Sequence, residues 1–153
     1  RTYGVDCGDA FDPQNPDHAG RRLSSYSYGG KVYTSVCDKF SEIVRHGARV
    51  ALKQVHQGGM FIIRGVASAA GSAHITGCIT IYASESACAR WVTDPGMMRI
   101  GTVGYTAKEG DTVRVDLCFG ASEIRATVVN LTTGAVTPSI VAYDFSEVAR
   151  DSA

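Results

Sequence analysis

Strict alternation of apolar and polar side chains marks the stretch Asp111-Thr-Val-Arg-Val-Asp-Leu-Cys-Phe119. Every second residue from Val113 to Phe119 is large and apolar, and the residues between them are Arg, Asp and Cys. Successive side chains of an extended chain point to opposite faces, so this period of two predicts a β-strand with one buried face. Turn residues flank it, in Glu109-Gly110-Asp111 and Gly120-Ala-Ser122. The stretch therefore predicts a short strand between tight turns, which is typical of antiparallel sheets.

The same alternation and the same kinds of turn recur along the chain after Gly47. They predict six further strands, at residues 48–55, 59–67, 74–82, 97–106, 123–130 and 139–144. Short strands at this spacing build antiparallel sandwiches or barrels. The expected fold class is mainly β (α+β), an antiparallel β-sandwich or barrel, and the length favours a single domain over residues 1–153.

One segment before Gly47 has helical periodicity. Its apolar residues are Val36, Phe40, Ile43 and Val44. Ser35 is a favourable residue to cap the start of a helix, and Gly47 suits its end. We therefore expect one amphipathic helix over residues 35–46. His46 would lie in its last turn, where a cation interacts favourably with the helix dipole.

The first thirty residues show neither the helical period nor the strand period of two. The segment Gly8-Asp-Ala-Phe-Asp-Pro-Gln-Asn-Pro-Asp-His-Ala-Gly20 is rich in residues that favour turns and loops. We expect residues 1–30 to form an extended arm that Cys7 ties to the rest of the domain. Because no initiator Met precedes Arg1, we expect that a signal or pro-segment was removed or that the sequence begins at an expression boundary.

Composition and charge exclude several classes of function. Lys plus Arg and Asp plus Glu balance at 15 each, so no overall field favours nucleic acid or an anionic membrane. The longest strongly apolar runs fall far short of the roughly 20 residues that a membrane-spanning helix needs. We therefore expect a globular protein with no nucleic-acid partner and no membrane insertion.

Five cysteines suggest an oxidising compartment. They are Cys7, Cys37, Cys78, Cys88 and Cys118. The absence of any C-x-x-C pair argues against a zinc ribbon or a thioredoxin-type site. We expect a secreted, extracellular protein whose disulfide candidates are Cys7, Cys37, Cys78 and Cys88, with Cys118 as the possible free thiol. A Cys7–Cys37 bridge would fix the arm to the helix, but the sequence does not decide the connectivity. Asn130-Leu-Thr132 is a candidate glycosylation site.

No group of residues predicts a catalytic, metal or cofactor site. His74 lies on the same predicted strand face as Cys78, but four residues along a strand span about 13 Å, too far for a direct dyad. The four histidines, at positions 18, 46, 56 and 74, lack the spacing of a metal site. No phosphate-binding glycine motif is present. We expect no metal and no cofactor, and we assign no catalytic residue.

Aromatic residues are the best candidates for a binding surface. Tyr26, Tyr28 and Tyr33 lie close together in the sequence, and Trp91 lies in a predicted loop. Exposed rings of this kind stack on sugars or contact partner proteins. These four residues are therefore the predicted binding residues, although about half of such rings are expected to pack internally.

The N-terminal third resembles the small secreted killer toxins of smut fungi. The resemblance is carried by Gly4-Val-Asp-Cys-Gly8, by Val36-Cys37 and by His46-Gly-Ala-Arg-Val50. In that family a cysteine-bearing helix is followed by a His-Gly turn and a strand. Its members are non-enzymatic toxins that block calcium uptake in target cells. The resemblance implies a fungal effector or virulence protein.

A second resemblance, over residues 57–134, is to the sandwich of secreted glutamic peptidases. It is carried by Gln57-Gly58, Trp91 to Pro95, Glu109-Gly-Asp-Thr-Val113 and Val129-Asn-Leu-Thr-Thr-Gly134. A Gln and a Glu of that family activate water against a peptide carbonyl. The resemblance implies the Gln role for Gln57, and Glu147 is the available downstream Glu.

These observations favour a secreted, disulfide-containing effector or toxin-like protein. It would bind a host or competitor protein or glycan without catalysis. The alternatives are an acid hydrolase of the glutamic-peptidase type that uses Gln57, and a carbohydrate-binding module that uses the tyrosines and Trp91.

Overall fold

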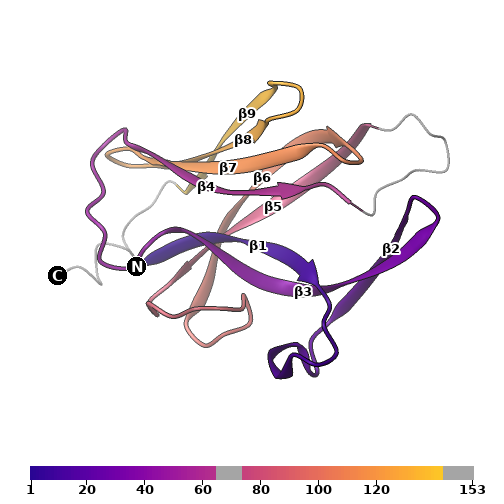
Figure 1. The fold of residues 1–153 in the computed structure, drawn as a ribbon. Helices are drawn as coiled ribbons and strands as arrows, with labels where there is room; N and C mark the ends of the chain where they lie inside the picture. The colour runs from indigo at the N-terminus through magenta and orange to yellow at the C-terminus, as the bar shows by residue number, and fades with distance from the viewer. Residues whose placement is uncertain (65–73, 143–153) are drawn as a thin grey trace.

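The fold is a β-sandwich of two antiparallel sheets (Figure 1). The computed structural model describes residues 1–64 and 74–142. Nine strands lie within these ranges: β1 (Thr2–Ala10), β2 (Leu23–Tyr28), β3 (Lys31–Val44), β4 (Val55–Ile62), β5 (His74–Ser84), β6 (Met97–Lys108), β7 (Thr112–Phe119), β8 (Ile124–Asn130) and β9 (Val136–Ala142). The mainly β prediction is confirmed, and the sheets form a sandwich with free edges rather than a closed barrel.

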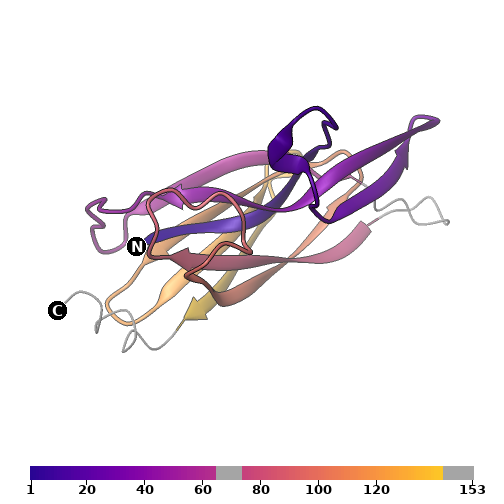
Figure 2. The ribbon, with the colours of Figure 1, turned by 90° about the horizontal axis from the view of Figure 1, so that it is seen from below.

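The first sheet has the strand order β2-β3-β1-β5-β6, and the second has the order β4-β7-β8-β9. All neighbouring strands are antiparallel. Figure 2 shows the hairpin of β2 and β3 reaching past the sandwich at the end opposite the N-terminus. No helix in the described part of the chain has the length and apolar character needed to cross a membrane.

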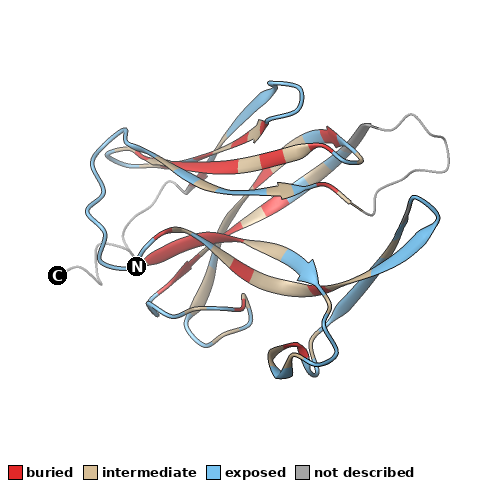
Figure 3. Ribbon diagram, viewed as in Figure 1, coloured by how far each residue is buried: buried red, intermediate tan, exposed pale blue. Residues whose placement is uncertain are grey.

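One hydrophobic core lies between the sheets. Val113, Val115 and Leu117 of β7 are completely or almost completely buried, as the alternation of that stretch predicts. They pack with residues of the first sheet such as Val5 and Ile81. Figure 3 shows the buried parts of β1 and β7 facing each other across this space, whereas the β2–β3 hairpin is largely exposed. The core therefore ends before the hairpin.

The predicted helix over residues 35–46 is wrong, because this segment belongs to strand β3. Val36, Phe40 and Val44 are all buried and so imitate a helical period, but of the three only Val44 belongs to the core between the sheets. Asp38 adopts a left-handed φ of 65°, and the register against β1 shifts beside it. Such a bulge is compatible with a strand whose apolar spacing is irregular. The α component of the prediction is absent from the described residues, in which the one helical element is the 3-10 turn η1 (Pro16–His18).

The segment predicted as an arm, residues 1–30, contributes two strands and η1. β1 is the central strand of its sheet, and Gly4 lies so close to β3 that a Cβ there would be 2.1 Å from the Ser41 carbonyl oxygen. Gly4 and Asp6 alternate with the buried residues Tyr3 and Val5. This segment has too few large apolar residues for its alternation to be recognised as that of a strand. The predicted strand over 48–55 is instead a connection, and β4 begins at Val55.

Candidate functional site

The first sheet divides into two halves at one end. β1 pairs with β5 only where Thr2–Val5 lies opposite Ile81–Ser84. Beyond Val5, β1 continues along β3 as far as Ala10, whereas β5 remains paired with β6 back to His74. The two halves diverge toward the hairpin end of the molecule (Figure 1). We call this divergence between β1 and β5 the split.

Asp6 marks the point at which the split begins. Its carboxylate accepts a hydrogen bond from the Thr80 backbone N–H at 3.2 Å. A backbone ladder between β1 and β5 would otherwise continue here, because Val5 and Ile81 are the last residues in register. The side chain therefore satisfies the first donor that the separating strands leave behind.

A groove of about 740 Å³ lies at the split. Its walls come from both halves of the first sheet, and the end of β4 from the other sheet lines it as well. The groove is comparable in size with ligand sites in proteins, which span about 300–1,000 Å³. It is our candidate functional site.

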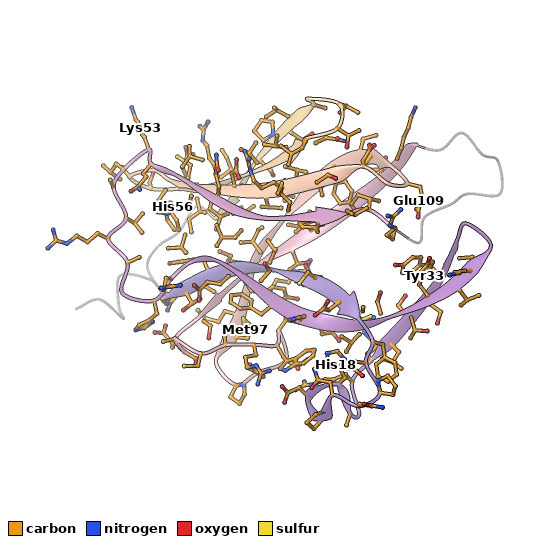
Figure 4. All side chains as sticks on the ribbon, in the orientation of Figure 1. His18, Tyr33, Lys53, His56, Met97 and Glu109 are labelled. Atoms are coloured by element: carbon orange, nitrogen blue, oxygen red, sulfur yellow. The ribbon has the colours of Figure 1, made fainter. Side chains whose placement is uncertain are left out.

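Two of the predicted binding residues line this groove. Tyr26 of β2 lies opposite Tyr33 of β3, and their rings stack with centroids 5.4 Å apart and planes 19° from parallel. The turn that joins these strands is Gly29-Gly30, and both residues have positive φ, as a two-residue hairpin requires. Tyr33 lies on the hairpin side of the split (Figure 4).

Two exposed apolar residues of β4 border the groove, on the strand face that they share with Arg114 and Thr112. Met60 and Ile62 are 70% and 51% exposed, and both line the groove. Strand β4 contains no Asp, Glu, Lys, Arg or Pro, which are the residues that commonly protect an edge strand. Periodicity alone did not single out these residues, because folding brings β4 beside the split. Contiguous exposed apolar surface of this kind is typical of interaction sites.

Charge in the groove is unevenly neutralised. Lys39 pairs with Asp9 at 2.7 Å, so these two charges largely cancel. Tyr105 lines the groove and has a raised pKa, first because of burial, then because of the nearby Cys78 and Asp6. The negative charge of Asp6 therefore reaches into the groove. Arg64 is a further charged residue of the lining.

The structure contains no disulfide, and all five cysteines have free thiols. The bridge expected between Cys7 and Cys37 is therefore not formed. That expectation placed Cys37 on a helix, whereas Cys37 lies on strand β3, which pairs with β1. Cys7, Cys37 and Cys78 instead line the groove, Cys88 lies in the β5–β6 connection, and Cys118 is half-buried on β7. Burial is the main cause that raises the pKa of Cys7, so its thiol is a weaker nucleophile than an exposed one.

Trp91 lies outside the groove and is buried. The Arg21 guanidinium carbon lies 3.9 Å from the centre of its ring, a cation–π contact. His18 also packs against this ring, and its Nδ1 accepts a hydrogen bond from the Asp12 backbone N–H. The 11–22 segment is thereby anchored to the β5–β6 connection. Trp91 thus holds the fold together and offers no free ring face.

The other predicted site residues are dispersed. Gln57 is exposed on β4 opposite Asp116 and does not line the groove. Glu147 and the side chain of Tyr28 lie outside the described residues. Asn130, the candidate glycosylation site, is buried, and its Nδ2 donates a hydrogen bond to Asp111. The nitrogen that would carry a glycan is therefore occupied in the folded domain.

Comparisons of the chain with protein-family models, curated proteins and solved structures gave no match. Within residues 1–64 and 74–142, no cluster of three His, Cys, Asp or Glu side chains is arranged to hold a metal ion.

Proposed function

We propose that this protein is a non-enzymatic binding protein whose groove holds an extended segment of a partner protein. The observation that carries the proposal is the groove itself, of about 740 Å³, with a stacked tyrosine pair on one side and exposed Met60 and Ile62 on the other. Aromatic rings and methionine are enriched where proteins contact each other.

A protein segment fits this surface better than a sugar. Tyr26 and Tyr33 cover one face of each other's ring, which leaves less ring surface for stacking on a sugar. Exposed Met60 and Ile62 gain most from contact with apolar side chains, because burial of apolar area provides the main driving force. The flexible thioether of methionine also adapts to different apolar partners.

Binding also accounts for the groove better than catalysis. The burial that raises the pKa of the Cys7 thiol opposes its activation as a nucleophile. Gln57, which the glutamic-peptidase resemblance implies as catalytic, is exposed outside the groove. The geometry therefore favours the effector-like interpretation over the hydrolase.

Secretion and action on a host or competitor complete the proposal. They rest on the resemblance of the N-terminal third to fungal killer toxins. Recovery of the tagged native gene product from the culture medium is the expected result. Retention of the product inside the producing cells would contradict this part alone.

The binding proposal is tested by selecting random twelve-residue peptides, displayed on phage, against the full chain. We expect enriched peptides to lose at least tenfold in affinity for an Ile62→Arg variant, because a charge replaces apolar surface in the groove. Leu52→Arg is the matched control, since Leu52 is similarly exposed but lies outside the groove. Enriched peptides that bind both variants as tightly as the parent chain would overturn the proposal.

A further inference from the structure

The free edge of β5 inside the split is the part of the groove with the most specific geometry. The Thr80 N–H points toward β1, since it donates to Asp6. Backbone groups alternate in direction along a strand, so the N–H groups of Thr76 and Cys78 point the same way. Residues 74–80 of β5 have no strand partner on this side within the described part of the chain. They present a short row of backbone donors and acceptors to the groove.

The facing edge of β1 leaves space for another chain. Gly8 has no side chain and borders the groove. The Ala10 N–H is taken up by the neighbouring Asp9 carboxylate at 3.0 Å, so it does not need a strand partner. At Ala10 the β1 edge is therefore satisfied without a ladder to β5, whereas the β5 edge keeps the capacity to form one.

We propose that an extended segment of a partner protein adds as a strand to the free edge of β5 inside the split and places a Lys or Arg side chain near Asp6. This inference rests on the proposed function and specifies the partner. Strand addition supplies affinity through backbone hydrogen bonds and specificity through alternate side chains.

Charge complementarity supports the basic side chain. Asp6 raises the pKa of both Cys7 and Tyr105, in each case as a contribution smaller than burial, so its field extends over the split. Lys39, whose charge opposes the burial that raises the pKa of Cys7, is paired with Asp9 at 2.7 Å. A cation of the ligand placed beside Asp6 would therefore be attracted by its carboxylate, and the Tyr105 ring near Asp6 would add a cation–π contact.

The position of the split indicates that the ligand is a single strand and not a second copy of this sandwich. A strand inside the split has β5 on one side and β1 on the other. The edge strand of a folded sheet brings its own neighbour along one side and would collide with β1. The occupant must therefore be a segment without its own sheet, such as a disordered tail or loop, which orders on binding.

The test uses a peptide that the groove selects and that Ile62→Arg releases. Two versions are N-methylated at alternate residues, so that each keeps the side chains but loses one row of backbone donors. We expect at least one version to bind tenfold or more weakly. In the complex with the parent peptide, hydrogen exchange at the Thr76 and Cys78 amides should slow at least tenfold.

The charge is tested separately with Asp6→Asn, which keeps an acceptor for the Thr80 N–H. This variant should bind selected peptides that contain Lys or Arg about fivefold more weakly and neutral ones equally well. Unchanged affinity of both methylated peptides together with unchanged amide exchange would overturn strand addition, while groove binding would stand. Equal affinity of the Asp6→Asn variant for the basic peptides would overturn the charge assignment. Failure to obtain any groove-dependent peptide would overturn both this inference and the proposed function.

Discussion

Replacement of Asn130 by Ala tests the network that closes the hairpin between β8 and β9. The Asn130 side chain is 3% exposed and makes three hydrogen bonds. Its Nδ2 donates to the buried Asp111 carboxylate at 2.9 Å, and its Oδ1 accepts from the N–H groups of Thr132 and Thr133. These contacts join the β6–β7 turn to the β8–β9 turn.

The expected loss of stability is about 3 kcal/mol. A hydrogen bond to a charged group contributes about 1.5–3 kcal/mol, and an ordinary one contributes about 0.5–1.5 kcal/mol. The two turn amides can partly recover water, so we take about 0.5 kcal/mol for each of them and about 2 kcal/mol for the bond to Asp111. For a domain of this size the loss lowers the melting temperature by roughly 6–12 °C.

Urea unfolding followed by circular dichroism measures this loss. Thr137→Ala, an exposed change on the neighbouring β9, is the control and should alter stability by less than about 0.5 kcal/mol. Asn130→Asp keeps the acceptor for the turn amides but places a second carboxylate against Asp111. Because adjacent carboxylates raise the pKa of one of the pair above its usual value, the destabilisation should diminish as the pH falls toward about 4. A loss under about 1 kcal/mol for Asn130→Ala would refute the role assigned to this network.

Four further results are expected. Gly4→Ala should lower the free energy of unfolding in urea by more than about 2 kcal/mol, because the new Cβ would overlap the Ser41 carbonyl oxygen. Gly8→Ala should lower it little, since its Cβ would lie 3.5 Å from the nearest atom. Equal losses for the two variants would contradict the close packing at Gly4. Burial raises the pKa of the Cys7 thiol and the Tyr3 phenol in the folded state. The free energy of unfolding should therefore be constant up to about pH 9 and fall above it. An unchanged free energy of unfolding at alkaline pH would contradict the burial of these two groups. Disulfide mapping by mass spectrometry should count five free thiols, with Cys88 modified faster than Cys7, and the recovery of two bridges would contradict the structure. Arg21→Ala should shift the emission of the single tryptophan to longer wavelength, whereas the exposed Arg45→Ala should not.

The sequence predicted the second sheet better than the first. The stretch around Val113 alternates without interruption, and its predicted range of 111–119 lies within one residue of β7. In contrast, β1 contains Gly4 where β3 approaches and Asp6 where the sheet divides, and both residues interrupt the apolar signal. β3 contains a bulge at Asp38, which changes the spacing of its apolar residues.

The candidate site was predictable only in part. Tyr26 and Tyr33 are close in sequence and were singled out, and the structure places both in the groove. Met60 and Tyr105 belong to distant segments and line one groove only because folding brings β4 beside the split. The loss of pairing between β1 and β5 depends on the path of both strands, which no local pattern records. Trp91 was singled out from the sequence as a binding residue, but Arg21 covers its ring in the structure.

The central place of β1 in its sheet has a consequence for how the chain folds during synthesis. Tyr3 pairs with Ala83, so this strand cannot complete its ladder until about 80 more residues have been made. At roughly 5–20 residues per second, the ribosome needs about 4–16 s to supply them. During that delay β1 can pair on one side alone, with β3, and its other edge stays open. Asp6, which later caps the Thr80 N–H, places a charge in the middle of the strand and so discourages premature association with other chains.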